Sequence, residues 1–249
     1  MGLLAVLLMF ALLIVWFVGV NSTLDWAAYK SNPGLARVAL FLGADPSLPG
    51  KKGFPPLHWA AWRADERVVE LLLEHGANVA AVDCFGRTPL CWAAGARTPR
   101  IVELLLRYHA DPNTPIRGGK SSGTTPLMLA AGAQDVVSAR ALVAAGATVN
   151  ARDTYGGTAL SLAALAGQPG VVEFLIGAGA AVDARDRVGM TPLFWAATNG
   201  EEEAVIVLLR HGADPSAKDR RGRPWLDRVR RMHPELMPVI AKHAAKRKR

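Results

Sequence analysis

The residues that could do chemistry are few and scattered along the chain. Histidine occurs at positions 58, 75, 109, 211, 233 and 243. These spacings do not match those of zinc sites, whose ligands come in closely spaced pairs. The sequence also lacks a G-x-S-x-G nucleophile motif. The acidic run at 201–203 lies at the predicted start of a helix, where negative charge stabilises the helix dipole. The sequence therefore predicts no catalytic residue, no metal site and no cofactor, and indicates a protein that is not an enzyme.

Two short patterns have a chemical and a structural interpretation. Gly118-Gly119-Lys120-Ser121 resembles part of a phosphate-binding loop, but the full motif needs an earlier glycine and a preceding strand, and both are missing. A flexible loop is therefore predicted. The two cysteines fall in different predicted elements, Cys84 in a loop and Cys91 in a helix. Free thiols are favoured over a disulfide, which suits a reducing compartment.

An internal repeat of 33 residues organises the chain. Its marker leucine recurs at residues 24, 57, 90, 127, 160, 193 and 226, and a turn glycine recurs at 53, 86, 123, 156, 189 and 222. The leucine intervals are all 33 residues except one of 37, which places a four-residue insertion within residues 113–123. A fixed period in this range is typical of a solenoid, in which each unit buries its faces only against its neighbours.

Each repeat carries the signals of two helices. The first helix has a threonine N-cap in four repeats (Thr88, Thr125, Thr158 and Thr191). A proline follows three of these threonines, at the first helical position, where a missing N–H costs nothing. The second helix carries an apolar stripe and ends at a glycine, which suits the left-handed position after a helix. His109 holds this position in the third repeat, so we expect a local weak point there.

The repeats resemble the ankyrin repeat, whose signature is T-P-L-H-x-A. The best copies are Thr88-Pro89-Leu90, Thr191-Pro192-Leu193 and Pro56-Leu57-His58-Trp59-Ala60-Ala61, and the resemblance covers residues 22–240. It implies an all-α ankyrin repeat solenoid of helix-turn-helix repeats with β-hairpin-like loops, in which His58 bonds loop backbone. The predicted repeats are 21–53, 54–86, 87–123, 124–156, 157–189 and 190–222, with a capping repeat at 223–241.

The resemblance also implies a function. Ankyrin repeats bind protein partners through the concave face of their first helices and through their loop tips. Carried over by alignment, the partner-binding positions are Tyr29, Trp62, Arg63, Phe85, Arg87, Arg117, Lys120, Tyr155, Arg187 and Asn199. Trp62 is the foremost candidate, because exposed aromatic residues are common interface anchors. Its alternative interpretation is packing on Tyr29 of the preceding repeat.

The N-terminal segment predicts a membrane anchor. Residues 2–20 are nineteen uncharged, mainly apolar residues, and a helix of that length, about 28 Å, would cross the hydrocarbon core. No basic residue precedes this run, and Val18-Gly19-Val20 is a poor cleavage site, so an anchor at 1–20 is favoured over a signal peptide or a buried helix. Lys30 and Arg37 predict a single-pass protein with cytoplasmic repeats. Cleavage would instead give a periplasmic or secreted protein.

The net charge of +8 is a property of the C-terminal end. Residues 220–249 hold 11 Lys and Arg but 2 Asp and Glu, so the repeats themselves are near neutral. The basic tail at 242–249 is predicted to be solvated or to contact anionic lipid, and nucleic acid is disfavoured. The sequence thus predicts a monomeric, non-enzymatic protein-binding module tethered to a membrane. The alternative is association of the basic tail with a membrane surface or a nucleic acid.

Overall fold

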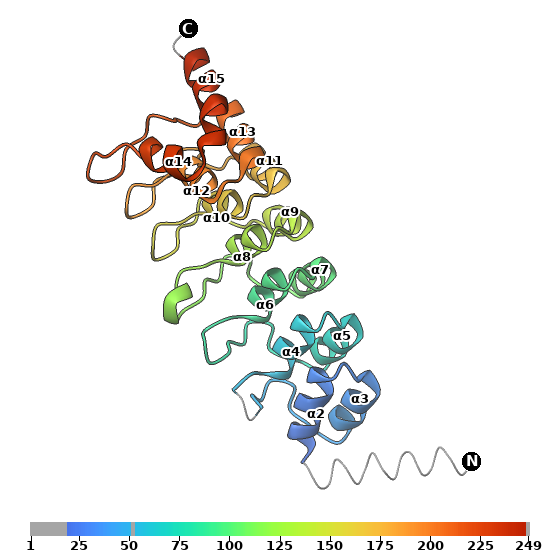
Figure 1. Cartoon of the computed structure of the whole chain (residues 1–249). Coiled ribbons are helices and arrows are strands. Elements are labelled where there is room, and N and C mark those ends of the chain that lie inside the picture. Colours follow the sequence, from blue (N-terminus) through green and yellow to red (C-terminus); the bar gives the residue numbers. More distant parts are fainter. Residues whose placement is uncertain (1–18, 51–52, 248–249) are drawn as a thin grey trace. The chain divides into compact units, whose positions relative to one another are not determined.

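The computed structural model describes residues 19–50 and 53–247, and the side chains up to residue 243. The chain divides into two compact units, residues 1–118 and 119–249. The division falls within the insertion of the third predicted repeat. Each unit is a row of helical hairpins whose loops leave on one side (Figure 1).

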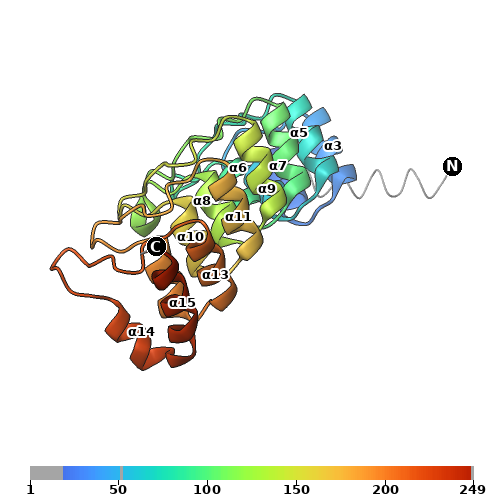
Figure 2. The same ribbon diagram turned by 90° about the horizontal axis from the view of Figure 1, so that it is seen from above.

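Unit 1 contains helices in two layers. The first helices of its hairpins are α2 (Val20–Tyr29), α4 (Pro56–Trp62) and α6 (Pro89–Gly95), and the second helices are α3 (Pro33–Phe41), α5 (Glu66–Glu74) and α7 (Pro99–Arg107). Helices α2, α4 and α6 pack in order on one another, as do α3, α5 and α7. Figure 2 shows the same unit from above, with α3, α5 and α7 in one row.

Unit 2 repeats this arrangement. Its first helices are α8 (Pro126–Gly132), α10 (Ala159–Leu165), α12 (Pro192–Asn199) and α14 (Leu226–Met232). Its second helices are α9 (Val136–Ala144), α11 (Pro169–Gly177), α13 (Glu202–Arg210) and α15 (Met237–Arg247). Short 3-10 turns lie at Gly119–Ser121 (η1) and Pro234–Leu236 (η2). The predicted capping segment thus contains α14, η2 and the start of α15.

The helix starts follow the predicted capping chemistry. The hydroxyl oxygens of Thr88, Thr125, Thr158 and Thr191 each accept a hydrogen bond from the backbone N–H three residues on. Proline occupies the first helical position of α6, α8 and α12, as the sequence predicts. These local bonds satisfy donors that a helix start otherwise leaves unpaired.

Left-handed residues end the helices. The second residue after α3, α5, α9, α11 and α13 is a glycine with φ between 84° and 90°, for example Gly76 and Gly179, and His109 at the same position after α7 has φ 63°. The predicted left-handed position of His109 is therefore confirmed. Four further non-glycine residues with positive φ lie in the turns between the first and second helices, a feature the sequence does not reveal: Ser31, Ala64, Arg97 and Gln134.

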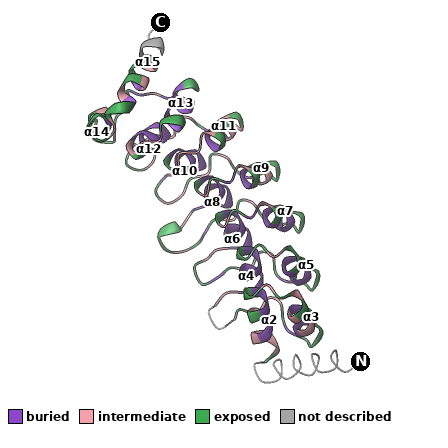
Figure 3. Cartoon of the chain, turned by 45° about the vertical axis from the view of Figure 1, so that its right-hand side comes forward, coloured by how far each residue is buried: buried purple, intermediate pink, exposed green. Residues whose placement is uncertain are grey.

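The core lies between the two helix layers and between neighbouring hairpins. The paired alanines of the first helices are fully buried, including Ala60, Ala61, Ala163 and Ala164. Figure 3 shows these first helices largely in the colour of buried residues, whereas the second helices keep an exposed outer face. Small side chains let neighbouring first helices approach closely, and leucines of the second helices fill the remaining space.

The loops between hairpins are closed turns, and the described residues include no strand longer than an isolated bridge between Lys218 and Pro224. At four tips a glycine N–H donates to an aspartate carbonyl, as Gly189 does to Asp186 at 3.0 Å. Backbone hydrogen bonds connect neighbouring loops. For example, the N–H of Arg220 donates to the carbonyl of Val188 at 3.0 Å. An added Cβ at Gly189 would lie 2.7 Å from the Arg220 nitrogen, so the tip requires glycine.

The predicted membrane anchor lies almost entirely outside the described residues. Gly19 and Val20 of that segment already form the start of α2. Within residues 19–50 and 53–247, every helix is too short or too polar to cross a membrane.

Candidate functional site

A connected group of aromatic rings lies in unit 1, on α2, α4 and α6 and the loops before α4 and α6. Trp59 is its centre, with ring centroids 5.1 Å from Tyr29, 5.0 Å from Phe54 and 5.9 Å from Trp92. Trp62 lies 6.2 Å from Trp59 and 6.3 Å from Trp92. These rings meet edge to face, the favoured geometry for aromatic pairs. The group is therefore rigid.

Part of this group is open to solvent. Trp59 is 9% exposed, whereas Trp62 is 45% and Phe85 is 56% exposed. The ring contacts of Trp62 are with Trp59 and Trp92, and the Arg63 guanidinium lies 5.8 Å from the ring centroids of both Trp62 and Tyr29. Trp62 is thus supported from below by other rings and keeps nearly half of its surface exposed.

Cations lie over the exposed rings. Besides Arg63, the Lys30 ammonium lies 5.1 Å from the Tyr29 ring centroid. The Arg87 guanidinium lies 4.8 Å from the Phe85 ring and 4.3 Å from the Trp92 ring. All these distances are within the range of cation–π attraction. We call the set Tyr29, Lys30, Trp62, Arg63, Phe85, Arg87 and Trp92 the aromatic–cationic surface.

A buried carboxylate holds one side of this surface in place. Asp83 accepts the backbone N–H groups of Phe85 (2.8 Å) and Arg87 (2.9 Å) and also the Arg87 Nε–H (2.9 Å) and the Trp92 indole N–H (2.8 Å). Burial alone would raise the pKa of Asp83, but these donors outweigh it and lower the pKa below its ordinary value. The carboxylate therefore stays ionised and fixes Arg87 and Trp92.

His58 has the structural role that the ankyrin resemblance implies. Its Nε2–H donates to the Arg87 carbonyl at 2.9 Å, and its ring packs edge to face against Trp92 at 6.3 Å. Burial lowers its pKa, with smaller opposing effects from the Arg87 carbonyl and Asp83, so the ring is neutral. His58 positions the loop that carries Arg87.

The predicted partner-binding residues divide between the two units. Tyr29, Trp62, Arg63, Phe85 and Arg87 come together in the aromatic–cationic surface. Arg117 lies beside it in the next loop of unit 1, with its backbone N–H on the Gly86 carbonyl at 3.2 Å.

The other predicted positions belong to unit 2. Lys120 lies in η1, and Tyr155 is 60% exposed at a loop tip, where its carbonyl accepts the Arg187 N–H at 2.9 Å. Asn199 donates from Nδ2 to the Leu165 carbonyl and to Glu201, so its amide joins neighbouring hairpins.

Three members of the ring group, Phe54, Trp59 and Trp92, were absent from the predicted binding positions. Phe54 connects Phe85 to Trp59 and Trp92. The sequence gives little indication of this role, because the residue type at this position varies between repeats and is Arg87 in the next one. Trp92 is half-buried, and its indole N–H is fixed by Asp83. The spacing of 33 residues could have indicated that the rings of Trp59 and Trp92 lie in contact.

In the described part of the chain, no group of three His, Cys, Asp or Glu residues could hold a metal ion. Cys84 and Cys91 do not form a disulfide, as predicted, and burial raises the pKa of the Cys91 thiol. Lys120 lies in a 3-10 turn, and no strand of the described residues leads into it, so the phosphate-loop interpretation gains no support.

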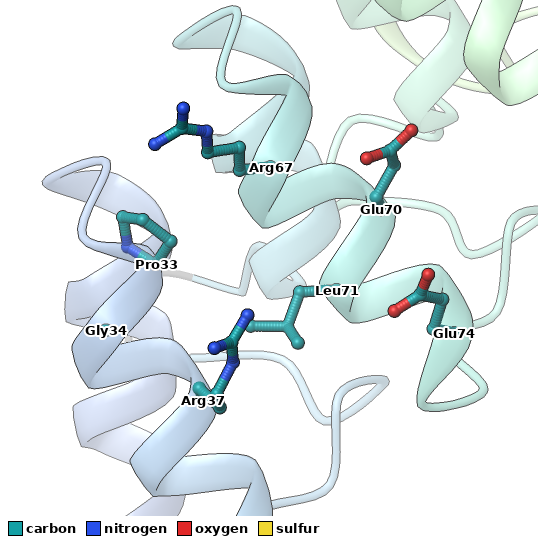
Figure 4. Close-up of a pocket in the computed structure, with 7 residues that line it drawn as sticks. All are labelled: Pro33, Gly34, Arg37, Arg67, Glu70, Leu71 and Glu74. Carbon is teal, nitrogen blue, oxygen red and sulfur yellow. The ribbon is translucent and has the colours of Figure 1, made fainter.

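The second-helix side of unit 1 has an open groove of about 480 Å³ between α3 and α5. Figure 4 shows its lining, in which Arg37 lies close to Leu71 while Glu70 and Glu74 extend from α5. Arg67 also lines it. Charges of both signs surround this groove, so it favours no ligand of one charge and is better explained as a polar outer face.

The two layers of short hairpins, closed by turn loops and repeated in both units, define a helical repeat protein. A family model described as ankyrin repeats (3 copies) matches residues 24–116 and 127–219. The chain belongs to the ankyrin repeat family. Ankyrin repeats are protein–protein interaction modules, and the family is generally a non-enzymatic binding scaffold. No curated protein matches this chain.

Proposed function

We propose that the chain binds a protein partner through the aromatic–cationic surface of unit 1 while residues 2–20 tether it to a membrane. The observation that carries the first part is the exposure of Trp62 and Phe85 on a rigid support of other rings. Aromatic and arginine side chains supply most of the binding energy of protein interfaces. Their concentration in one unit indicates where the partner lies.

Pre-organisation supports the same surface. Ordering side chains on binding costs free energy, about 0.5–1.5 kcal/mol for each flexible side chain. In this surface Arg87 is already bonded to Asp83, and Arg63 already lies against two rings. A partner that lands on these groups therefore loses little affinity to their immobilisation.

The tether rests on the apolar sequence of residues 2–20 and on one feature of the described residues beside it. Phe41, at the end of α3, is 87% exposed, and Leu42 follows it at 38%. The same two positions of the next repeat hold Glu74 and His75. Apolar side chains in place of polar ones suit a location next to lipid headgroups. Accessibility of residues 22–249 to protease outside intact cells tests the proposed cytoplasmic side, because complete digestion would contradict it.

The basic tail is a second candidate. Residues 242–247 of this tail form the second half of α15. Anionic vesicles or RNA would bind it in a salt-dependent way, because cations on the tail displace counterions from the polyanion.

Partner capture tests the proposed surface. The double variant Trp62→Ala/Arg63→Ala should lose the captured partner, since it removes the exposed ring and the cation over it. Leu165→Ala is the matched control, because Leu165 occupies the position of Trp62 two repeats into unit 2 and is 37% exposed. Equal capture by wild type and the double variant would remove this surface from the proposal.

A further inference from the structure

We infer that the aromatic–cationic surface selects a peptide segment in which Asp or Glu residues flank an apolar side chain. This inference rests on the proposed function and adds the chemistry of the partner. It follows from three features of unit 1: unpaired cations, ring faces already covered by the chain's own cations, and the absence of acidic residues from the two central helices.

Exposed cations mark the ends of the first helices of unit 1. Lys30 follows α2, Arg63 follows α4 and Arg97 lies in the turn after α6, and all three are exposed. None of the three forms an ion pair with another described residue. Helices α4 and α6 themselves contain no acidic residue. A partner lying along these helix ends therefore meets Lys30, Arg63 and Arg97, although Asp65, Glu66 and Glu70 line an open pocket beside Arg63.

The acidic side chains nearest to Arg63 in sequence have other contacts. The Asp65 carboxylate caps α5 by accepting the Val68 N–H at 3.1 Å. The Glu66 carboxylate lies 3.8 Å from the Arg100 guanidinium. Arg63 lines an open pocket with Asp65, Glu66 and Glu70 but forms no ion pair with these residues. Its guanidinium can therefore still pair with a carboxylate of the partner.

The ring faces are unsuited to a cationic side chain of the partner. An exposed group of tryptophan and tyrosine rings could in principle bind a cationic side chain. Here Arg63 already lies over Trp62 and Tyr29, and Arg87 over Phe85 and Trp92. A lysine or arginine of the partner would meet like charge at each ring. The exposed ring edges remain for an apolar side chain.

The overall charge of unit 1 favours a peptide over a nucleic acid. Residues 19–118 hold 11 Lys and Arg and 9 Asp and Glu, which is a small excess of positive charge. Domains that bind nucleic acids through the phosphate backbone carry a strongly basic face. The cations of this surface are few and lie beside apolar rings, an arrangement that matches short acidic-apolar segments.

Selection from a random peptide library tests the inference. The full chain, held in detergent micelles, is the bait, and the measurement is the mean net charge and aromatic or aliphatic content of the enriched peptides. We expect enriched peptides to be more acidic than the starting library by at least about one charge. We also expect Arg63→Gln to lower the affinity for the enriched peptides about two- to fivefold, as loss of an exposed ion pair does.

Arg107→Gln is the matched control, because Arg107 is an exposed arginine on the second-helix side of the same unit. It should leave the affinities unchanged. Enrichment of neutral or basic peptides, or no enrichment, would overturn the inference, as would an RNA oligonucleotide that outcompetes the peptides in an Arg63-dependent way. The proposed function fails separately, when partner capture does not depend on Trp62.

Discussion

Replacing Asp83 by asparagine tests whether this carboxylate fixes Arg87 and Trp92 in the aromatic–cationic surface. Asparagine has nearly the same shape, but only its oxygen accepts hydrogen bonds. That oxygen can still accept the backbone N–H groups of Phe85 and Arg87. The amide NH₂ then faces two donors, Arg87 Nε–H at 2.9 Å and Trp92 Nε1–H at 2.8 Å. The hydrogen bonds to Arg87 Nε–H and Trp92 Nε1–H are therefore lost, and the new NH₂ group points at these two donors without an acceptor between them.

The expected cost is about 2–3 kcal/mol of local stability. A neutral hydrogen bond contributes about 1 kcal/mol, and a bond to a charged group about 1.5–3 kcal/mol. The Arg87 side chain is 32% exposed, so water compensates part of its loss and the lower end of that range applies. The Trp92 indole N–H also loses its acceptor, an oxygen of the fully buried Asp83 side chain, and bears the rest of the penalty. We therefore expect both side chains to lose their fixed positions.

Hydrogen exchange measured on residues 83–92 reports this change directly. Exchange should be about 30- to 150-fold faster in Asp83→Asn, the ratio that corresponds to about 2–3 kcal/mol. Asp186→Asn is the matched control in unit 2, since Asp186 accepts the Trp195 indole N–H at 3.1 Å but has Met190 in place of the arginine. Its effect on residues 186–195 should be smaller.

The same variant has a pH signature. The pKa of Asp83 is lower in the folded chain than its ordinary value of 3.8, so its contribution is complete above pH 3.8 and disappears as the pH falls through the lowered pKa. Wild type should lose stability in this acidic range, and Asp83→Asn should lack that component. Unchanged exchange at residues 83–92 together with an identical acid profile would refute the role given to Asp83.

Three further changes have defined outcomes. His109→Gly should raise the free energy of unfolding, measured in denaturant, by about 1 kcal/mol, because His109 has a φ of 63°. The reciprocal variant Gly76→His, at φ 84°, should lower that free energy by a similar amount. Equal stabilities of the variants and wild type would contradict the strain at His109. Gly189→Ala should cost more than 1 kcal/mol, whereas Gly177→Ala, at an open helical position, should be neutral or stabilising. Deleting residues 242–249 should abolish salt-sensitive vesicle binding, and unaltered binding would exclude the tail.

Much of the fold was predictable because its signals are local. Thr88 and Pro89 specify a helix start through bonds within one turn, and glycine specifies the left-handed helix end. The turns at Ala64 and Arg97 were not predictable, since neither residue prefers a positive φ and the packing of two helices imposes it. The division of the chain at residues 118 and 119 likewise has no sequence signal beyond the insertion itself.

The candidate surface was predictable only in part. Alignment to the ankyrin repeat indicates which positions face outward, and five of the ten predicted residues do meet in one surface. Alignment does not indicate which side chains touch. The position of Arg63 between Tyr29 and Trp62 depends on the rotamers of three long side chains, and the link from Phe85 to Trp59 through Phe54 depends on how two loops stack.

Other repeats form the same kind of hairpin without a tryptophan at the position of Trp62. The position of Trp62 is held by Tyr29 in the first repeat and by Gly95, Gly132, Leu165 and Thr198 in the third to sixth repeats, and hairpins of the same kind form around each of them. The carboxylate-and-indole contact also recurs without an exposed aromatic group, in Asp186 and Trp195. Trp62→Ala should therefore change stability by less than about 1 kcal/mol while it weakens partner binding. A loss of stability as large as that of Asp83→Asn would mean that Trp62 is part of the core, and the argument for an exposed binding surface would then rest on Phe85 alone.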